Sequence, residues 1–231
     1  MKLIASDYDD TFYKDDESIE INKEYVDNFR NKGNYFAFAT GRSFEDFMKK
    51  KDTYNLEYDY LIINHGATVL DKDNNVLFNN IIDDSVVSSI RECLDLDTAI
   101  SYFCCQTYKS RMDFRDLNLT KINSKYSTSE ECFKIVDTLN KKFSDYIKAY
   151  YVNHNNVEVI KKGTNKMEAI KKLGEYLNIK KEDIYTIGDS YSDMEMIEGF
   201  NGYAVRNAIN ELMEASIKVV DNVSDLIEDV M

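Results

Sequence analysis

Short apolar runs alternate with amphipathic segments along the first 65 residues. Residues 3–6, 35–39 and 60–63 are mostly apolar, and a polar residue follows each run. Residues 21–32, and a segment through about residue 51, have the apolar spacing of helices. This alternation of strands and helices is typical of a parallel sheet with helices on its faces.

The pattern changes after residue 66 and returns near the end of the chain. Residues 67–70 and 76–78 flank a polar pentapeptide and predict a hairpin. From about 83 to 160, a helix, several tyrosine-rich strands, a second helix near 129–143 and two more strands suit an antiparallel α+β unit. The later alternation predicts helices at 165–177, 192–198 and 208–215, strands at 184–187, 203–205 and 218–220, and a last short helix.

These segments predict an α/β fold in which an insertion interrupts a doubly wound, Rossmann-like parallel sheet. We expect residues 1–80 and 163–231 to form the sheet domain, and residues 81–162 to form the inserted α+β domain. Open α/β sheets bind ligands outside the carboxyl ends of their strands, so we expect the functional residues there.

Composition narrows the function classes. The 231 residues carry 29 basic and 42 acidic side chains, a net charge of −13, so we expect neither nucleic acid nor an anionic membrane surface as a partner. No apolar run approaches the roughly 20 residues of a membrane span, and a signal-peptide layout is absent, so we expect a cytoplasmic protein. The four cysteines and two histidines make no zinc motif, and we expect small buried thiols. The sequence offers no reason for its lack of proline.

An acidic motif, Asp7-Tyr8-Asp9-Asp10-Thr11, begins where the first predicted strand ends. Aspartates one residue apart are uninformative alone, because 25 aspartates among 231 residues give about three such pairs by chance. A threonine two positions further on lowers the chance expectation to about 0.1, and only residues 7–11 match. The alternative interpretation is a solvated acidic turn or a helix cap.

Three further polar motifs lie at predicted strand ends or helix starts. Thr40-Gly41-Arg42 suits an anion-binding nest or a plain helix N-cap. Lys166 opens a helix, where a lysine is usually solvated. Asp189 ends a strand, and Asp193 follows at a position where it could be only an N-terminal helix charge. Together the motifs supply what phosphoryl transfer needs: a nucleophile, a proton-transfer group, a cation for phosphoryl oxygens and carboxylates for a divalent metal.

The order of these motifs resembles the haloacid dehalogenase-like hydrolase superfamily, whose four motifs match here as DYDDT, TGR, Lys166 and GDSYSD. The insertion between the second and third motifs, with NHGA at 64–67 and VRNA at 205–208, is most similar to the Cof-type sugar-phosphate phosphatase branch. The resemblance implies a magnesium-dependent phosphatase of a small phosphorylated metabolite, with a sugar phosphate as the family-level expectation. It also implies an aspartyl-phosphate intermediate and a cap domain, the insertion, that selects the substrate.

The resemblance further implies a role for each matching position. Asp7 would be the nucleophile, and Asp9 the general acid that protonates the leaving oxygen and later activates water. The transferring phosphoryl group would be bound by Thr40, Gly41 and Lys166. Mg²⁺ would be held by Asp7, Asp189, Asp193 and the backbone carbonyl of Asp9.

Four features depart from the pattern of the branch. Ser192 stands where asparagine is common, so a hydrogen bond to the phosphate or metal shell is lost or made by a hydroxyl. Asp10 replaces a frequent glycine, a mild change because aspartate tolerates left-handed backbone. His65 interrupts the usual Asn-Gly-Ala and is either a site residue or, as we expect, one satisfied by backbone. The insertion is also short, which bears on the substrate more than on the chemistry.

Two other functions stay open at this stage. A phosphomutase would use the same aspartyl-phosphate. A non-enzymatic signalling module of the receiver type also accepts phosphate on an aspartate near a threonine and a lysine. In that fold, however, the nucleophile follows a later strand and the domain is much shorter, so the sequence favours the hydrolase.

Overall fold

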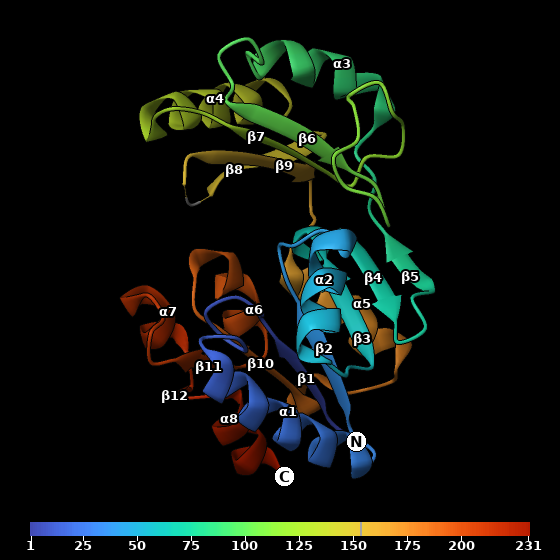
Figure 1. Ribbon diagram of the computed structural model, residues 1–231, viewed down its shortest axis with the longest axis vertical. Helices are drawn as coiled ribbons and strands as arrows, with labels where there is room; N and C mark the ends of the chain where they lie inside the picture. The colour runs from blue at the N-terminus through green and yellow to red at the C-terminus, as the bar shows by residue number, and fades with distance from the viewer. Residues whose placement is uncertain (153) are drawn as a thin grey trace. The chain divides into compact units, whose positions relative to one another are not determined.

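The computed structural model describes residues 1–152 and 154–231, and the chain divides into two compact units. The first unit comprises residues 1–42, 47–78 and 165–231, and the second comprises residues 43–46 and 79–164 (Figure 1). That these units act as a catalytic core and a cap stays a prediction.

The first unit is built on an eight-stranded sheet among the described residues. Every neighbouring pair from one edge through the sixth strand is parallel, and the next pair is antiparallel. The predicted hairpin therefore extends the sheet, which is mixed and not purely parallel. In sheet order the strands are β12 (Lys218–Val220), β11 (Asn201–Val205), β10 (Ile184–Gly188), β1 (Leu3–Ser6), β2 (Tyr35–Ala39), β3 (Tyr60–Ile63), β4 (Thr68–Asp71) and β5 (Val76–Asn79).

Helices cover this sheet in two groups. Helix α1 contacts β2 and packs against α8, whereas α5 contacts β3 and β4 and packs against α6. The helices of this part of the chain are α1 (Asp16–Asn31), α2 (Phe44–Tyr54), α5 (Lys166–Tyr176), α6 (Met194–Gly199), α7 (Asn210–Ala215) and α8 (Val223–Val230).

Helix α1 begins five residues earlier than its apolar spacing predicts, because Asp15 caps it. The Asp15 carboxylate accepts a hydrogen bond from the Ser18 amide, and the Ser18 hydroxyl oxygen accepts one from the Asp15 amide. Such a reciprocal cap stabilises a polar first turn. At the other end, Gly33 has a φ of 81°, which agrees with its predicted role as a stop signal.

The chain winds in opposite directions from the two central strands, β1 and β10. From β1 it passes through α1 to β2 on one side, and from β10 it passes through α6 to β11 on the other. The two strands pair in parallel from Leu3 with Ile184 to Ser6 with Ile187. Ligands bind at such a topological switch point, beyond the carboxyl ends of the strands. Asp7 and Asp189 are the residues that come next in the chain.

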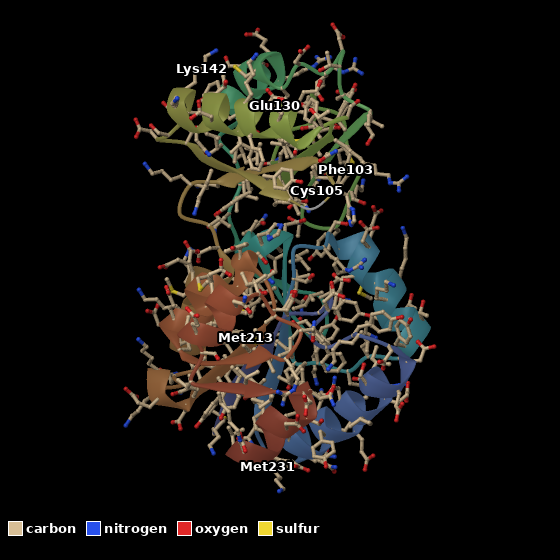
Figure 2. All side chains as sticks on the ribbon, turned by 90° about the vertical axis from the view of Figure 1, so that its left-hand side faces the viewer. Phe103, Cys105, Glu130, Lys142, Met213 and Met231 are labelled. Atoms are coloured by element: carbon tan, nitrogen blue, oxygen red, sulfur yellow. The ribbon has the colours of Figure 1, made fainter. Side chains whose placement is uncertain are left out.

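The second unit is the predicted antiparallel α+β fold. Its sheet has the order β6 (Ser101–Cys105), β7 (Lys121–Lys125), β9 (Asn156–Lys161) and β8 (Ile147–Val152), and every pair is antiparallel. Helices α3 (Asp84–Cys93) and α4 (Ser129–Lys142) contribute to a core with apolar side chains of the sheet. Figure 2 labels Glu130 in the first turn of α4 and Lys142 in its last turn, charges placed favourably for the helix dipole.

The cysteines of the second unit are unpaired, and three of the four, Cys104, Cys105 and Cys132, are buried as the sequence predicts. Burial raises the pKa of the Cys105 thiol to about 11, so it stays a protonated, small apolar side chain near neutral pH. Within the described part of the chain, no helix has the length and apolar character that crossing a membrane requires.

Candidate active site

Lys166 joins two of the predicted site aspartates. Its Nζ donates hydrogen bonds to Asp7 Oδ1 at 2.7 Å and to Asp193 Oδ1 at 2.6 Å. All three side chains are buried: Lys166 is 2 % exposed, Asp7 7 % and Asp193 0 %. Buried charges are tolerated when they are paired and hydrogen-bonded, so this arrangement excludes the solvated surface lysine that was the alternative for Lys166.

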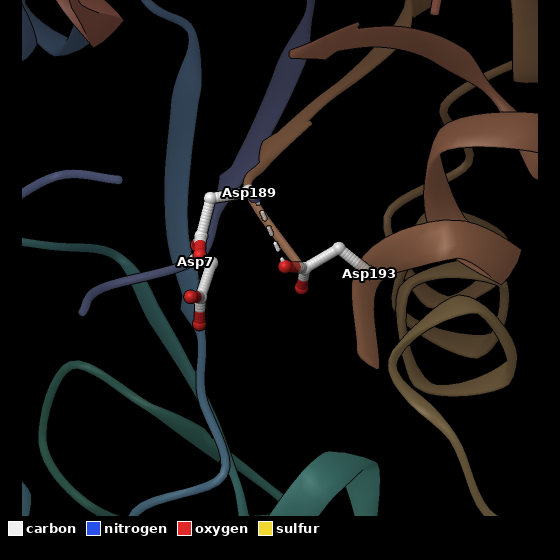
Figure 3. Close-up of side chains that lie close together, drawn as sticks. All are labelled: Asp7, Asp189 and Asp193. Carbon is white, nitrogen blue, oxygen red and sulfur yellow. Dashed lines mark hydrogen bonds between the residues drawn. The ribbon is translucent and has the colours of Figure 1, made fainter. Parts of the chain in front are cut away.

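Asp189 completes a cluster of three carboxylates with Asp7 and Asp193 (Figure 3). One oxygen from each of the three lies within 4.8 Å of the others. Asp193 Oδ2 accepts hydrogen bonds from the backbone amides of Asp189 at 3.2 Å and Ser190 at 3.1 Å. Asp193 therefore holds the loop after β10 in place and is more than a helix-end charge.

Two features of the local backbone determine the position of Lys166. Asn165 caps α5 by accepting the Glu168 amide at 2.7 Å, which sets Lys166 as the first helical residue. Gly66 has a φ of 95° and lies so close to this helix start that a Cβ there would be 2.2 Å from the Asn165 carbonyl oxygen. Only glycine fits this approach, so the NHGA segment fixes the position from which Lys166 reaches the carboxylates.

Burial and repulsion between the carboxylates raise the pKa values of two site aspartates, which favours the binding of a cation. Burial raises the pKa of the Asp7 carboxyl well above its usual range, which Lys166 opposes and Asp193 reinforces. Burial, reinforced by the Asp193 charge, raises the pKa of Asp189 to about 6. For Lys166, burial acts to lower the pKa, but Asp193 and Asp7 outweigh it and raise the pKa above its usual value. One ammonium group thus faces three carboxylates.

The excess of carboxylates fits a hard divalent cation such as Mg²⁺. Carboxylate oxygens are the ligands that Mg²⁺ prefers, and the three oxygens converge in a region where two pKa values are raised by burial and like charge. A bound cation would relieve that repulsion. The donor set includes neither sulfur nor nitrogen, which argues against a zinc site of the structural kind.

The second predicted motif lies at the end of β2. Thr40 is 1 % exposed, and its Oγ1 accepts the Arg42 amide at 3.1 Å, which leaves the hydroxyl hydrogen to donate elsewhere. His65 covers this turn: its amide donates to the Thr40 carbonyl at 3.1 Å, and a Cβ on Gly41 would be 2.4 Å from the imidazole Cε1. That the His65 side chain is itself satisfied by backbone stays a prediction.

Asp9 points to another partner. Its two carboxylate oxygens accept hydrogen bonds from Arg42, Oδ2 from Nε at 2.8 Å and Oδ1 from Nη2 at 2.6 Å. Asp9 is not part of the carboxylate cluster formed by the other three aspartates. That Asp9 binds the metal through its backbone carbonyl, and keeps its side chain for proton transfer, stays a prediction.

Three residues whose roles could not be predicted from the sequence support the site. The Thr11 hydroxyl donates to Asp189 Oδ1 at 2.7 Å, and the Asn207 amide donates to the Asp10 carbonyl at 2.7 Å. Arg42, as described, binds Asp9. The threonine was the signal that made the motif specific, yet its partner could not be named. Asp10 itself has a φ of 56°, the left-handed backbone predicted from its replacement of glycine.

Ser192, the residue in place of the usual asparagine, turns toward its own loop. Its hydroxyl oxygen lies 3.0 Å from that of Ser190, and the Ser190 hydroxyl in turn donates to Asp193 at 3.1 Å. Ser192 thus stabilises the aspartate loop through Ser190.

Comparisons with known proteins agree with this geometry. The family model for haloacid dehalogenase-like hydrolases matches residues 4–110 and 99–226. A Buchnera aphidicola protein whose name proposes a phosphatase is 26 % identical over an alignment of 228 positions, which covers 85 % of this chain and 80 % of that protein. The 5-amino-6-(5-phospho-D-ribitylamino)uracil phosphatase of Bacillus subtilis is 24 % identical, covering 97 % of this chain and 92 % of that enzyme.

A solved structure supports the fold assignment. The haloacid dehalogenase-like hydrolase of Bacteroides thetaiotaomicron superposes with a TM-score of 0.87 at 18 % identity, covering 100 % of this chain and 99 % of the other. The predicted fold class is confirmed, and so is the predicted enzyme family. With its motifs distributed over the whole matched length, the chain belongs to the haloacid dehalogenase-like hydrolases.

Proposed function

We propose that the chain is a Mg²⁺-dependent phosphatase that hydrolyses a small phosphorylated metabolite through an aspartyl-phosphate on Asp7. The observation that carries this proposal is the contact of Lys166 with both Asp7 and Asp193, beside Asp189, where β1 and β10 end. A carboxylate nucleophile must be ionised when it meets a phosphoryl group that is itself anionic. The ammonium group serves both needs, since it favours ionised Asp7 and attracts phosphoryl oxygens.

The side chains can be assigned to the two half-reactions. In the first, an Asp7 oxygen attacks phosphorus, the bond from phosphorus to the ester oxygen breaks, and Asp9 gives its proton to the departing oxygen. In the second, Asp9 takes a proton from water, the resulting hydroxide attacks phosphorus, and the bond to Asp7 breaks to release inorganic phosphate. Asp9 returns to its starting state, so protons balance over the cycle.

The phosphoryl oxygens need donors while this exchange occurs. The contacts of Lys166 with Asp7 and Asp193 use two of its three ammonium hydrogens, and the third can point to the substrate. The buried Thr40 hydroxyl and the Gly41 amide would add neutral donors. Mg²⁺, held by Asp7, Asp189, Asp193 and the Asp9 carbonyl, would supply charge neutralisation at the phosphoryl oxygens when bound.

A sugar phosphate or polyol phosphate is the substrate class we propose to test first. The Bacillus subtilis relative is named for a substrate with a phosphorylated ribityl group, and the motif resemblance points to sugar phosphates. That name supplies candidates for the substrate panel.

The proposal is tested by steady-state phosphate release from p-nitrophenyl phosphate and a panel of sugar and polyol phosphates. We expect many turnovers with Mg²⁺ and none with excess chelator, on at least one panel member. Labelling that stops at one phosphate per chain would instead indicate a signalling module. Isomerisation of a sugar phosphate without phosphate release would indicate a phosphomutase.

A further inference from the structure

Arg42 forms a bidentate ion pair with Asp9, the carboxylate proposed as general acid and base. Two parallel hydrogen bonds of 2.8 and 2.6 Å join the guanidinium to both carboxylate oxygens. Such bidentate pairs fix direction as well as distance, because both groups are planar. The Asp9 side chain is 46 % exposed, so without this contact little would define its rotamer.

Contacts of both its backbone and its guanidinium fix the position of Arg42. Its carbonyl accepts the Asn64 amide at 2.9 Å, and its amide donates to Thr40 Oγ1 at 3.1 Å. Its guanidinium carbon lies 5.6 Å from the ring centroid of Tyr8, which is fully buried. The Tyr8 ring packs edge-on against Phe38 at 5.8 Å between centroids. Contact with this rigid aromatic core therefore fixes the position of Arg42, and Arg42 in turn fixes the position of the Asp9 carboxylate.

We propose that Arg42 is a positioning residue that acts through Asp9, holding its carboxylate where it can reach the leaving oxygen and the attacking water. This inference rests on the proposed function. A guanidinium fork also suits phosphate, so direct contact with the substrate is the competing role. The two roles differ in a measurable way: a residue that acts through Asp9 has nothing left to do once Asp9 cannot transfer a proton.

A double-mutant cycle separates them. We would measure kcat and KM of the wild type, Arg42→Ala, Asp9→Asn and the double variant with p-nitrophenyl phosphate and phenyl phosphate. Phenolate is the poorer leaving group and needs the acid more. We expect Arg42→Ala to lower kcat for phenyl phosphate about tenfold or more, with a smaller loss for p-nitrophenyl phosphate. In the Asp9→Asn background, Arg42→Ala should lower kcat less than about twofold. Such non-additive effects are expected of two coupled residues.

Arg30 provides the matched control. It makes the same two-point contact with Asp59, Nε to Oδ2 and Nη2 to Oδ1, each at 3.1 Å, within the same unit. Asp59 precedes β3, so this pair lies at the amino ends of the parallel strands. We expect Arg30→Ala to leave the ratio of the two substrates unchanged. Arg42→Lys, which keeps the charge but not the fork, should recover part of the loss and serves if the alanine variant is unstable.

Four outcomes would overturn the inference. An equal loss for both substrates, or a rise in KM alone, would assign Arg42 to phosphate binding. An undiminished effect of Arg42→Ala in the Asp9→Asn background would show that it acts independently of Asp9. A wild type with no turnover on any phosphate ester would instead remove the proposed function, and the inference with it.

Discussion

Lys166 and Asp7 are 159 positions apart in the chain, and a hydrogen bond of 2.7 Å joins their buried side chains in the first unit. One residue follows the first strand and the other starts the helix that follows the inserted segment. The contact explains how a buried carboxylate, whose pKa burial would raise, can still be available as an anion. It also makes the integrity of the site depend on segments from both sides of the inserted segment.

Removing the lysine should be costly to stability. Lys166→Met would leave Asp7 and Asp193 buried without their cation, and we expect the free energy of unfolding to fall by about 3–5 kcal/mol. Urea denaturation in the presence of chelator measures this. Lys162→Met is the control, because its contact with Asp145, at 3.6 Å, is exposed and should be worth less than about 1 kcal/mol. Equal losses in the two variants would contradict the buried charge balance.

Asp9→Asn should impair turnover in a way that depends on the leaving group. Asparagine keeps the shape but cannot donate a proton as an acid, so kcat for an alkyl phosphate should fall by about 10²–10⁴-fold, and less for p-nitrophenyl phosphate. Asp10→Asn is the matched control, because asparagine also tolerates the left-handed backbone at that position. Equal rate losses with good and poor leaving groups would refute the acid role of Asp9.

Magnesium affinity should weaken in acid. The pKa of Asp189 is raised to about 6, so below that pH protons compete with the cation, and affinity should fall about tenfold per pH unit. Asp7, whose pKa is also raised, acts in the same direction. Calorimetric titration with Mg²⁺ from pH 5 to 8 tests this expectation.

A variant of Thr11 gives a second test of the pH dependence of Mg²⁺ affinity. The Thr11 hydroxyl, 2.7 Å from Asp189 Oδ1, helps to lower the pKa of that carboxyl, so Thr11→Val should move the midpoint of the dependence to higher pH. An affinity that is the same at pH 5 and pH 8 would contradict the assignment of Asp189 as a ligand.

Gly188 should not tolerate a side chain. A Cβ at this last residue of β10 would lie 2.5 Å from the Cβ of Asp193, closer than real atoms approach. Gly188→Ala should therefore displace Asp193 and its contact with Lys166, and we expect lower stability and at least about a tenfold loss of kcat. Circular dichroism melting and phosphate release measure the two effects. Wild-type activity would show that the Asp193 position is not needed.

The sequence predicted much of the fold because buried strands bounded by polar residues are distinctive. The strands at 35–39, 60–63 and 218–220 have the predicted bounds. The predicted start of α1 was wrong because the first turn of this helix is polar and does not show the apolar spacing. The sequence feature that marks the true start is the reciprocal cap of Asp15 and Ser18. The mixed character of the sheet was missed because a hairpin pattern does not tell which existing strand it joins.

The sequence could predict which residues the structure brings together in the candidate site, but it could predict few of their contacts. Asp7 and Asp189 could be expected together because parallel strands bring their carboxyl ends to one edge. The pairing of Asp9 with Arg42 could not, since the direction of a side chain in a loop depends on the local backbone and not on apolar periodicity. The same holds for Thr11 and for Asn207, whose partner is a backbone carbonyl.

The proposed aspartyl-phosphate can be detected directly, as phosphate on Asp7 itself. The wild type would be mixed with p-nitrophenyl phosphate and Mg²⁺, quenched in acid during turnover, digested and analysed by mass spectrometry, beside Asp7→Asn. We predict a phosphorylated wild-type peptide containing Asp7, and an Asp7→Asn protein that is folded but at least about 10³-fold slower. Phosphate on a different residue, or an Asp7→Asn variant that turns over normally, would contradict it.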